Sequence, residues 1–221
     1  GVAEENRQLV RRWLRALVQH DMLVQDGDRY RLQQSVDTAV IARLWQRGEQ
    51  LIAGLDDNGG LLTYLERSSR CLPELLRGEE DPLNLLFPDG KLDVATHAYQ
   101  NNLISRLMNH LLLHAAEEKV RTMAERRRVR VLEIGAGVGG TSNVLIPLLA
   151  GYDVEYTFTD VSPFFLNEAR QRYQQHDFVR YQLYDFNRPP LEQGLDCGQF
   201  DMIVSNNVLH NAVVARDGLA N

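Results

Sequence analysis

A cluster of glycines in the second half of the chain has the spacing of a nucleotide-binding loop. Gly135, Gly137 and Gly140 satisfy the GxGxxG pattern and lie between a strand-like run at 129–134 and a helix-like run. Glycines at such a place let the backbone turn sharply and approach a ligand closely. Asp160 ends the next strand-like run, where a dinucleotide site has its ribose-binding acid. These features fit both a nicotinamide dinucleotide and S-adenosylmethionine.

Further side chains at the strand ends favour S-adenosylmethionine. We expect Glu133 to point from the strand end into the cleft, where a carboxylate suits the cationic methionine portion and would repel a pyrophosphate. Asp185 and Phe186 follow the third strand-like run and offer an acceptor for an adenine amino group and a ring to lie against the purine. The predicted cofactor-binding residues are Glu133, Gly135, Gly137, Gly139, Asp160, Asp185, Phe186 and Asn206.

The fourth strand-like run leads into two amides and an imidazole. Asn206, Asn207 and His210 follow the run at 200–205, at the edge where open α/β sheets bind ligands. Histidine accepts protons near neutral pH, so His210 is a candidate general base. No metal site is predicted, because His110 and His114 lack a third ligand and the two cysteines have no CxxC spacing.

Strands and helices alternate from Val129 onward, which predicts βαβ units with a parallel sheet. We place a Rossmann-like nucleotide-binding domain at 128–221 and a mainly helical lid or substrate subdomain at 1–127. Within the latter, helical spacing predicts a first helix at 5–20 and a hairpin turning at Asp26 and Gly27. Helix breaks are expected at 56–60 and at Pro73, and Leu103, Leu107, Leu111, Val120 and Met123 are expected to form one core-facing stripe.

Four segments together resemble the C-methyltransferase domains of modular polyketide synthases and hybrid peptide synthetases. They are LEIGAGVGGTS, YTFTDVSPFFLNEAR, YDFNRPPLEQG and FDMIVSNNVLH. The resemblance implies a class I methyltransferase fold that binds S-adenosylmethionine and methylates the α-carbon of a carrier-bound β-ketoacyl thioester. It makes His210 the base that removes the α-proton together with a later glutamate, and it places Tyr99 and Asn207 on the substrate side.

The same resemblance implies an acyl or peptidyl carrier protein, with its phosphopantetheine-bound substrate, and neighbouring synthase domains as partners. One departure concerns the loop after the base, where His210-Asn211-Ala212 stands in place of the family's His-Ala-Thr. The chain starts at Gly1 rather than Met and stops at Asn221, before the later strands of the fold, so we expect a piece of a longer protein.

Composition excludes several classes of function. A net charge of −6 argues against a phosphate-neutralising surface and hence against nucleic-acid binding. The sequence contains neither a long apolar run nor a signal peptide, so we expect a cytoplasmic protein without membrane contact. Alternatives to C-methylation remain: methylation at nitrogen or oxygen, a catalytically silent docking module, and a nicotinamide oxidoreductase.

Overall fold

The chain divides into two compact units in a computed structural model that describes residues 1–33, 35, 37–53, 60–214 and 216. The units are Gly1–Ala98 and Tyr99–Asn221. This division precedes the boundary predicted at residue 128, because the long helix α7 (Leu103–Ala124) packs against the sheet of the second unit. Whether the functional boundary lies at residue 128 stays a prediction.

The first unit is mainly helical, with one small hairpin. Strands β1 (Leu23–Asp26) and β2 (Arg29–Leu32) pair antiparallel, and Gly27 takes the positive φ of +60° that the tight turn requires. This confirms the predicted hairpin. The helices are α1 (Arg7–Gln19), α2 (Thr38–Ile52), α3 (Gly60–Arg70), α4 (Leu72–Arg77), α5 (Pro82–Leu86) and α6 (Asp93–Thr96), with short helical turns η1 (Glu4–Asn6) and η3 (Pro88–Gly90).

The two predicted helix breaks of this unit have different outcomes. Residues 54–59, which hold most of the first break, lie outside the described residues. Pro73 lies in the first turn of α4, just after α3 ends at Arg70. Proline is tolerated there because the first helical amides need no intrahelical acceptor. The break at Pro73 is therefore confirmed.

The second unit contains a parallel four-stranded sheet, in which the strands lie in the order β5-β4-β3-β6. Its elements after α7 are β3 (Val129–Ile134), α8 (Ser142–Leu149), β4 (Val154–Asp160), α9 (Pro163–Arg172), β5 (Val179–Leu183), η5 (Pro190–Gln193), β6 (Met202–Ser205) and η6 (Leu209–Asn211). A π-helical turn, η4 (His97–Asn101), precedes α7. The predicted α/β class with a parallel sheet is confirmed.

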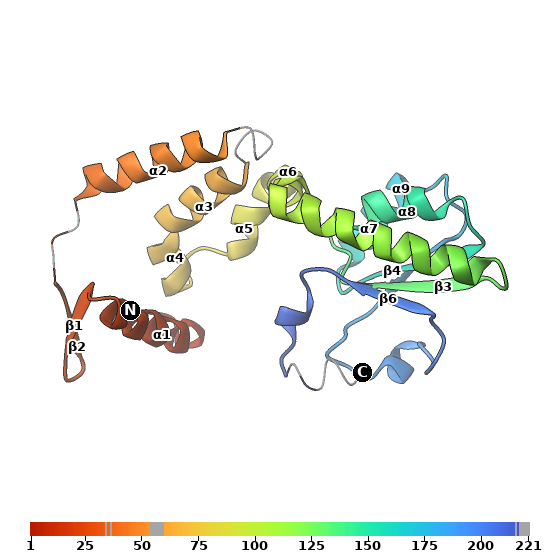
Figure 1. Cartoon of the computed structure of the whole chain (residues 1–221). Helices are drawn as coiled ribbons and strands as arrows, with labels where there is room; N and C mark the ends of the chain where they lie inside the picture. Colours follow the sequence, from red (N-terminus) through yellow and green to blue (C-terminus); the bar gives the residue numbers. More distant parts are fainter. Residues whose placement is uncertain (34, 36, 54–59, 215, 217–221) are drawn as a thin grey trace. The chain divides into compact units, whose positions relative to one another are not determined.

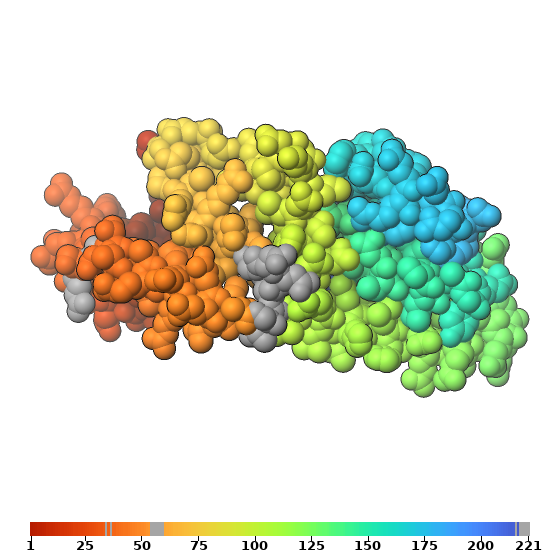
Figure 2. Space-filling view, turned by 90° about the horizontal axis from the view of Figure 1, so that it is seen from above, coloured from red at the N-terminus to blue at the C-terminus, as the bar shows by residue number. Residues whose placement is uncertain are grey.

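Helices α7, α8 and α9 cover one face of this sheet (Figure 1). In the space-filling view, which looks onto this helix layer, α8 lies between α7 and α9 (Figure 2). Alternation along β3 sends Val129 and Val131 into the core beneath the helices and Leu132 to the opposite face. There Leu132 packs with Tyr184, Phe186 and Leu195, from the connection between β5 and β6.

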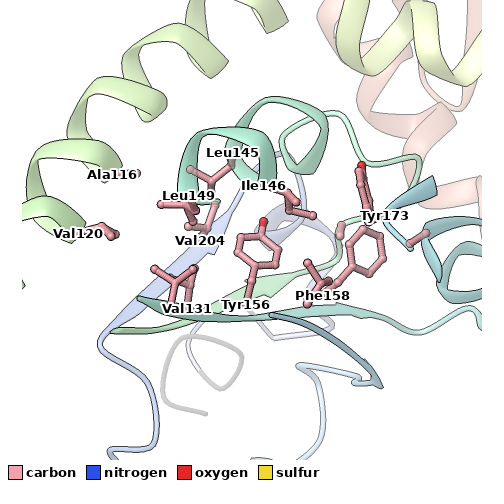
Figure 3. Packing of buried hydrophobic residues seen from close by; sticks show 14 of the residues in the cluster. Ala116, Val120, Val131, Leu145, Ile146, Leu149, Tyr156, Phe158, Tyr173 and Val204 are labelled. Carbon is pink, nitrogen blue, oxygen red and sulfur yellow. The ribbon is translucent and has the colours of Figure 1, made fainter. Parts of the chain in front are cut away.

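The predicted core stripe along α7 is wrong for its first half. Leu103, Leu107 and Leu111 are 47%, 53% and 57% exposed, whereas Ala116 and Val120 are buried against α8 and the sheet (Figure 3). An α-helix turns about 100° per residue, so Leu111 and Val120 lie about half a turn apart and cannot share a face. The buried residue in the first half of α7 is a polar one, Asn109. Of the helices in the described part of the chain, none is long and apolar enough to cross a bilayer.

Candidate functional site

The glycine loop after β3 takes a conformation that other residues rarely adopt. Gly135, Gly137 and Gly139 have φ of +63°, +53° and +80°. A Cβ on Gly135 would lie 2.6 Å from Val208 Cγ2, and one on Gly139 would lie 2.7 Å from the Tyr173 hydroxyl. A Cβ on Gly137 would have the Gly135 carbonyl oxygen as its nearest neighbour, 3.9 Å away, so there is open space beside this residue. Packing within the chain thus explains two of the glycines but not Gly137.

Asp160, at the end of β4, holds the glycine loop in place. Its two carboxylate oxygens accept hydrogen bonds from the backbone N–H groups of Gly137 and Ser162, each at 2.9 Å. Burial raises the pKa of this carboxyl, and the backbone hydrogen bonds oppose that effect. Because each carboxylate oxygen can accept a second hydrogen bond, Asp160 retains capacity for hydroxyl donors of a ligand.

Glu133 is enclosed rather than aimed into an open cleft, contrary to the expectation from the sequence. It is 2% exposed on the helix-covered face of the sheet. Its carboxylate accepts hydrogen bonds from the hydroxyls of Ser142 in α8 and of Tyr156 in β4, the latter at 2.7 Å. Burial raises its pKa to about 7, although both hydrogen bonds act in the other direction. The alternation of β3 explains this, since residue 133 shares the face of Val129 and Val131.

We expect Glu133 to make the unfolding free energy fall as the pH rises. Its pKa is higher in the folded chain than the ordinary value of 4.5, so its contribution is fully present below about pH 4.5 and is lost as the pH rises through about 7. The wild type should lose roughly 3 kcal/mol of unfolding free energy over that window, and Glu133→Gln should not show this loss. Urea unfolding of both proteins at pH 5 and pH 8 measures the difference.

The matched control for this experiment is Glu192→Gln, which changes an exposed carboxylate of the same unit. Circular dichroism should follow the unfolding, because both tryptophans, Trp13 and Trp45, lie in the first unit. If Glu133→Gln and wild type lose stability equally between the two pH values, the buried carboxylate does not titrate in this window.

Asp185 and Phe186 differ in their surroundings. Phe186 is 6% exposed and packs with Leu132 and Leu195, so its ring belongs to the core and is not free to stack on a ligand as expected. Asp185 is half-buried and caps the following turn, accepting from the Asn187 backbone N–H at 2.9 Å. Gln193, which the sequence did not single out, closes the loop by accepting from the Asp185 N–H and donating to its carbonyl.

The segment after β6 lies directly against the glycine loop. Val208 is in contact range of Gly135, as the Cβ distance above indicates. Asn207 is exposed with a positive φ of +58°, and His210 is exposed in η6. Asn206 is half-buried and donates its side-chain amide to Asn109 and Thr141.

The main chain at Tyr99 lies over the start of α8. Its carbonyl oxygen would be 3.0 Å from a Cβ on Gly140, and the side chain of the next residue, Gln100, accepts a hydrogen bond from Asn143 at 2.9 Å. Asn143 also accepts from the Tyr173 hydroxyl at 2.6 Å. The predicted site residues Tyr99, Gly137, Asp160 and the segment 206–210 are therefore brought to one edge of the sheet, whereas Glu133 and Phe186 are enclosed.

The sequence analysis missed two polar residues on helices that form hydrogen bonds at this edge, Asn109 and Asn143. The sequence feature that could have indicated them is a polar side chain within a helix rich in apolar residues. Within the described ranges, no three His, Cys, Asp or Glu side chains are grouped as metal ligands. His110 and His114 pack edge to face, with ring centroids 5.7 Å apart.

Comparison with known proteins identifies relatives of this chain. Residues 132–221 match the family described as "Methyltransferase domain". Polyketide synthase PksR of Bacillus subtilis is 31% identical over 82% of this chain, which covers 8% of that protein. Pyochelin synthetase PchF of Pseudomonas aeruginosa is 32% identical over 96% of the chain, which covers 12% of that protein. The chain thus spans a small part of the curated relatives it matches.

Two solved structures extend the similarity to the whole chain. The CurJ carbon methyltransferase is 31% identical with a TM-score of 0.86, and this chain covers 58% of it. The DszA carbon methyltransferase is 27% identical with a TM-score of 0.89, and this chain covers 57% of it. The fold and the family match define the class of protein: the chain has the fold of class I, S-adenosylmethionine-dependent methyltransferases, and residues 132–221 match a methyltransferase domain. Within that class it is related to the methyltransferase domains of polyketide synthases and peptide synthetases.

Proposed function

We propose that this chain binds S-adenosylmethionine at the carboxyl edge of its sheet and methylates the α-carbon of a β-ketoacyl thioester. The thioester is carried on the phosphopantetheine arm of an acyl or peptidyl carrier protein, within a synthase whose other domains are its neighbours. One observation carries the proposal: the glycine loop, Asp160 and the segment bearing Asn207 and His210 converge on one edge.

The residues at this edge fit the cofactor. The open space at Gly137 admits a ligand close to the backbone, and Asp160 can accept hydrogen bonds from ribose hydroxyls. Asp185 is assigned to the adenine amino group. When bound, the cofactor supplies a sulfonium-activated methyl group. Glu133 and Phe186 would then act on the site from within the core, by supporting the glycine loop and the loop after β5.

His210 is the proposed general base. It is exposed and held close to the glycine loop through Val208, so an acyl chain can reach it. Its imidazole takes the α-proton of the thioester, and the electron pair left on the α-carbon becomes the nucleophile. Tyr99 and Asn207, both exposed at the same edge, are assigned to substrate positioning.

Product mass tests this function. The complete domain is incubated with S-adenosylmethionine and a β-ketoacyl carrier protein, and the released acyl chain is analysed by tandem mass spectrometry. A new methyl group on the α-carbon is expected. A methyl group on oxygen or nitrogen would contradict C-methylation, and cofactor binding without any transfer would favour a silent docking module.

Asp160→Ala should weaken S-adenosylmethionine binding by about 1.5 to 3 kcal/mol, or roughly ten- to a hundredfold in Kd, because hydrogen bonds to a charged group are lost. Calorimetry measures it. Asp153→Ala is the matched control, since Asp153 is an exposed carboxylate beside the opposite end of β4. A 2′-deoxyribose analogue separates direct contact from loop support. If Asp160 binds the ribose hydroxyls, the analogue should bind the wild type more weakly than S-adenosylmethionine does. Its affinity should then fall little further in Asp160→Ala.

A further inference from the structure

A closed polar network connects α7 to both loops of the proposed site. Asn109 in α7 accepts hydrogen bonds at Oδ1 from the Thr141 hydroxyl at 3.0 Å and from Asn206 Nδ2 at 3.1 Å. Asn206 Nδ2 also donates to Thr141 Oγ1 at 2.9 Å. Asn109 Nδ2 donates to the Gly140 carbonyl at 3.2 Å. The network therefore joins the end of the glycine loop to the first residue after β6.

The donors and acceptors of this network match in only one orientation. Turning the Asn109 amide over would set its N–H groups against Asn206 Nδ2 and its oxygen against the Gly140 carbonyl oxygen, so both contacts would be lost. Asn109 and Thr141 are 4% and 3% exposed, which keeps water from replacing a lost partner. With Asn109 and Thr141 buried and hydrogen-bonded, such a network favours one arrangement of the segments that it joins.

Asn109 lies on the face of α7 that packs into the core. Ala116 lies about two turns further along α7 and Val120 one turn beyond, and both are buried against α8 and the sheet (Figure 3). Asn206 is thereby tied to a rigid helix, while Val208 contacts Gly135. Asn207 lies between these two fixed points, and His210 follows in η6, where the Asn211 N–H bonds to the Val208 carbonyl.

We propose that Asn109 is a positioning residue that sets the place of the segment 206–210 relative to the glycine loop through its hydrogen bonds to Thr141, Asn206 and Gly140. It reaches no reacting group. Its effect on methyl transfer rests on the proposed function, whereas its effect on the segment does not. A displacement of about 1 Å in a reacting group can lower a rate by about a hundredfold.

The experiment compares Asn109→Leu with Val120→Ala in the complete domain. Both change a buried residue of α7 and should lower the unfolding temperature, but the apolar side chain of Val120 makes none of the hydrogen bonds of the polar network. Hydrogen–deuterium exchange of the peptide that contains residues 206–210 should become at least about tenfold faster in Asn109→Leu and stay unchanged in Val120→Ala. Asn109→Asp keeps the Oδ1 acceptor for Thr141 and Asn206 but sets a second carboxylate oxygen against the Gly140 carbonyl, so it should restore only part of the protection.

Kinetics give the second readout. Asn109→Leu should lower kcat by about ten- to a hundredfold with S-adenosylmethionine Kd within about threefold, and Val120→Ala should leave both unchanged. Unchanged exchange at 206–210 in Asn109→Leu overturns the positioning role, whatever the activity. If exchange at 206–210 is faster in Asn109→Leu but the wild-type domain transfers no methyl group, the positioning role is supported and the proposed function is refuted.

Discussion

His210→Ala in the complete domain is expected to cut methyl transfer by about 10²- to 10⁴-fold, the usual contribution of a general base. S-adenosylmethionine affinity should stay within about twofold, because His210 is exposed in η6, whereas Asp160 accepts the hydrogen bond from the glycine loop. Single-turnover transfer to a carrier-bound substrate, with calorimetry on the same protein, measures the two effects separately.

His114→Ala is the matched control for this variant, since it removes an exposed imidazole from α7. Free imidazole added to His210→Ala should recover part of the rate, which a purely structural role would not allow. If His210→Ala transfers methyl groups at the wild-type rate, the imidazole is not the base, and only the cofactor-binding proposal stands.

Gly137→Val should abolish measurable S-adenosylmethionine binding, with a loss of at least about a hundredfold in affinity. The new side chain would occupy the open space beside the glycine loop, where the backbone must approach the cofactor. The positive φ of +53° adds a folding cost of about 1 to 2 kcal/mol for any residue with a Cβ. Calorimetry and a urea unfolding curve measure the two losses.

Gly198→Val separates the two effects of this substitution. Gly198 has a φ of +71° and no neighbour within 4 Å of an added Cβ, and it precedes β6 at the opposite edge of the sheet. Both variants should lose similar stability, and only Gly137→Val should lose cofactor binding. Normal binding by Gly137→Val would show that the cofactor does not lie against this part of the loop.

The sequence alone predicted the features that depend on local conformation. Alternating apolar residues and glycines specified the order of strands and helices from Val129 onward, and the parallel topology placed Asp160 and Asn206 at one edge. The hairpin at Gly27 and the helix break at Pro73 follow from backbone preferences of single residues, so they were equally predictable.

Only the tertiary structure decided which side chains of that edge are enclosed. Glu133 and Phe186 occupy strand-end positions that resemble open ones in sequence, yet α8 covers the first and the loop after β5 encloses the second. The sequence predicted a leucine stripe in the core of α7, whereas Asn109 is buried there instead. A buried amide is stable only when its partners are present, and those of Asn109 lie in Gly140, Thr141 and Asn206, far along the chain. Local periodicity contains no information about such distant partners, so this part of the site was settled by the packing of α7 against both loops.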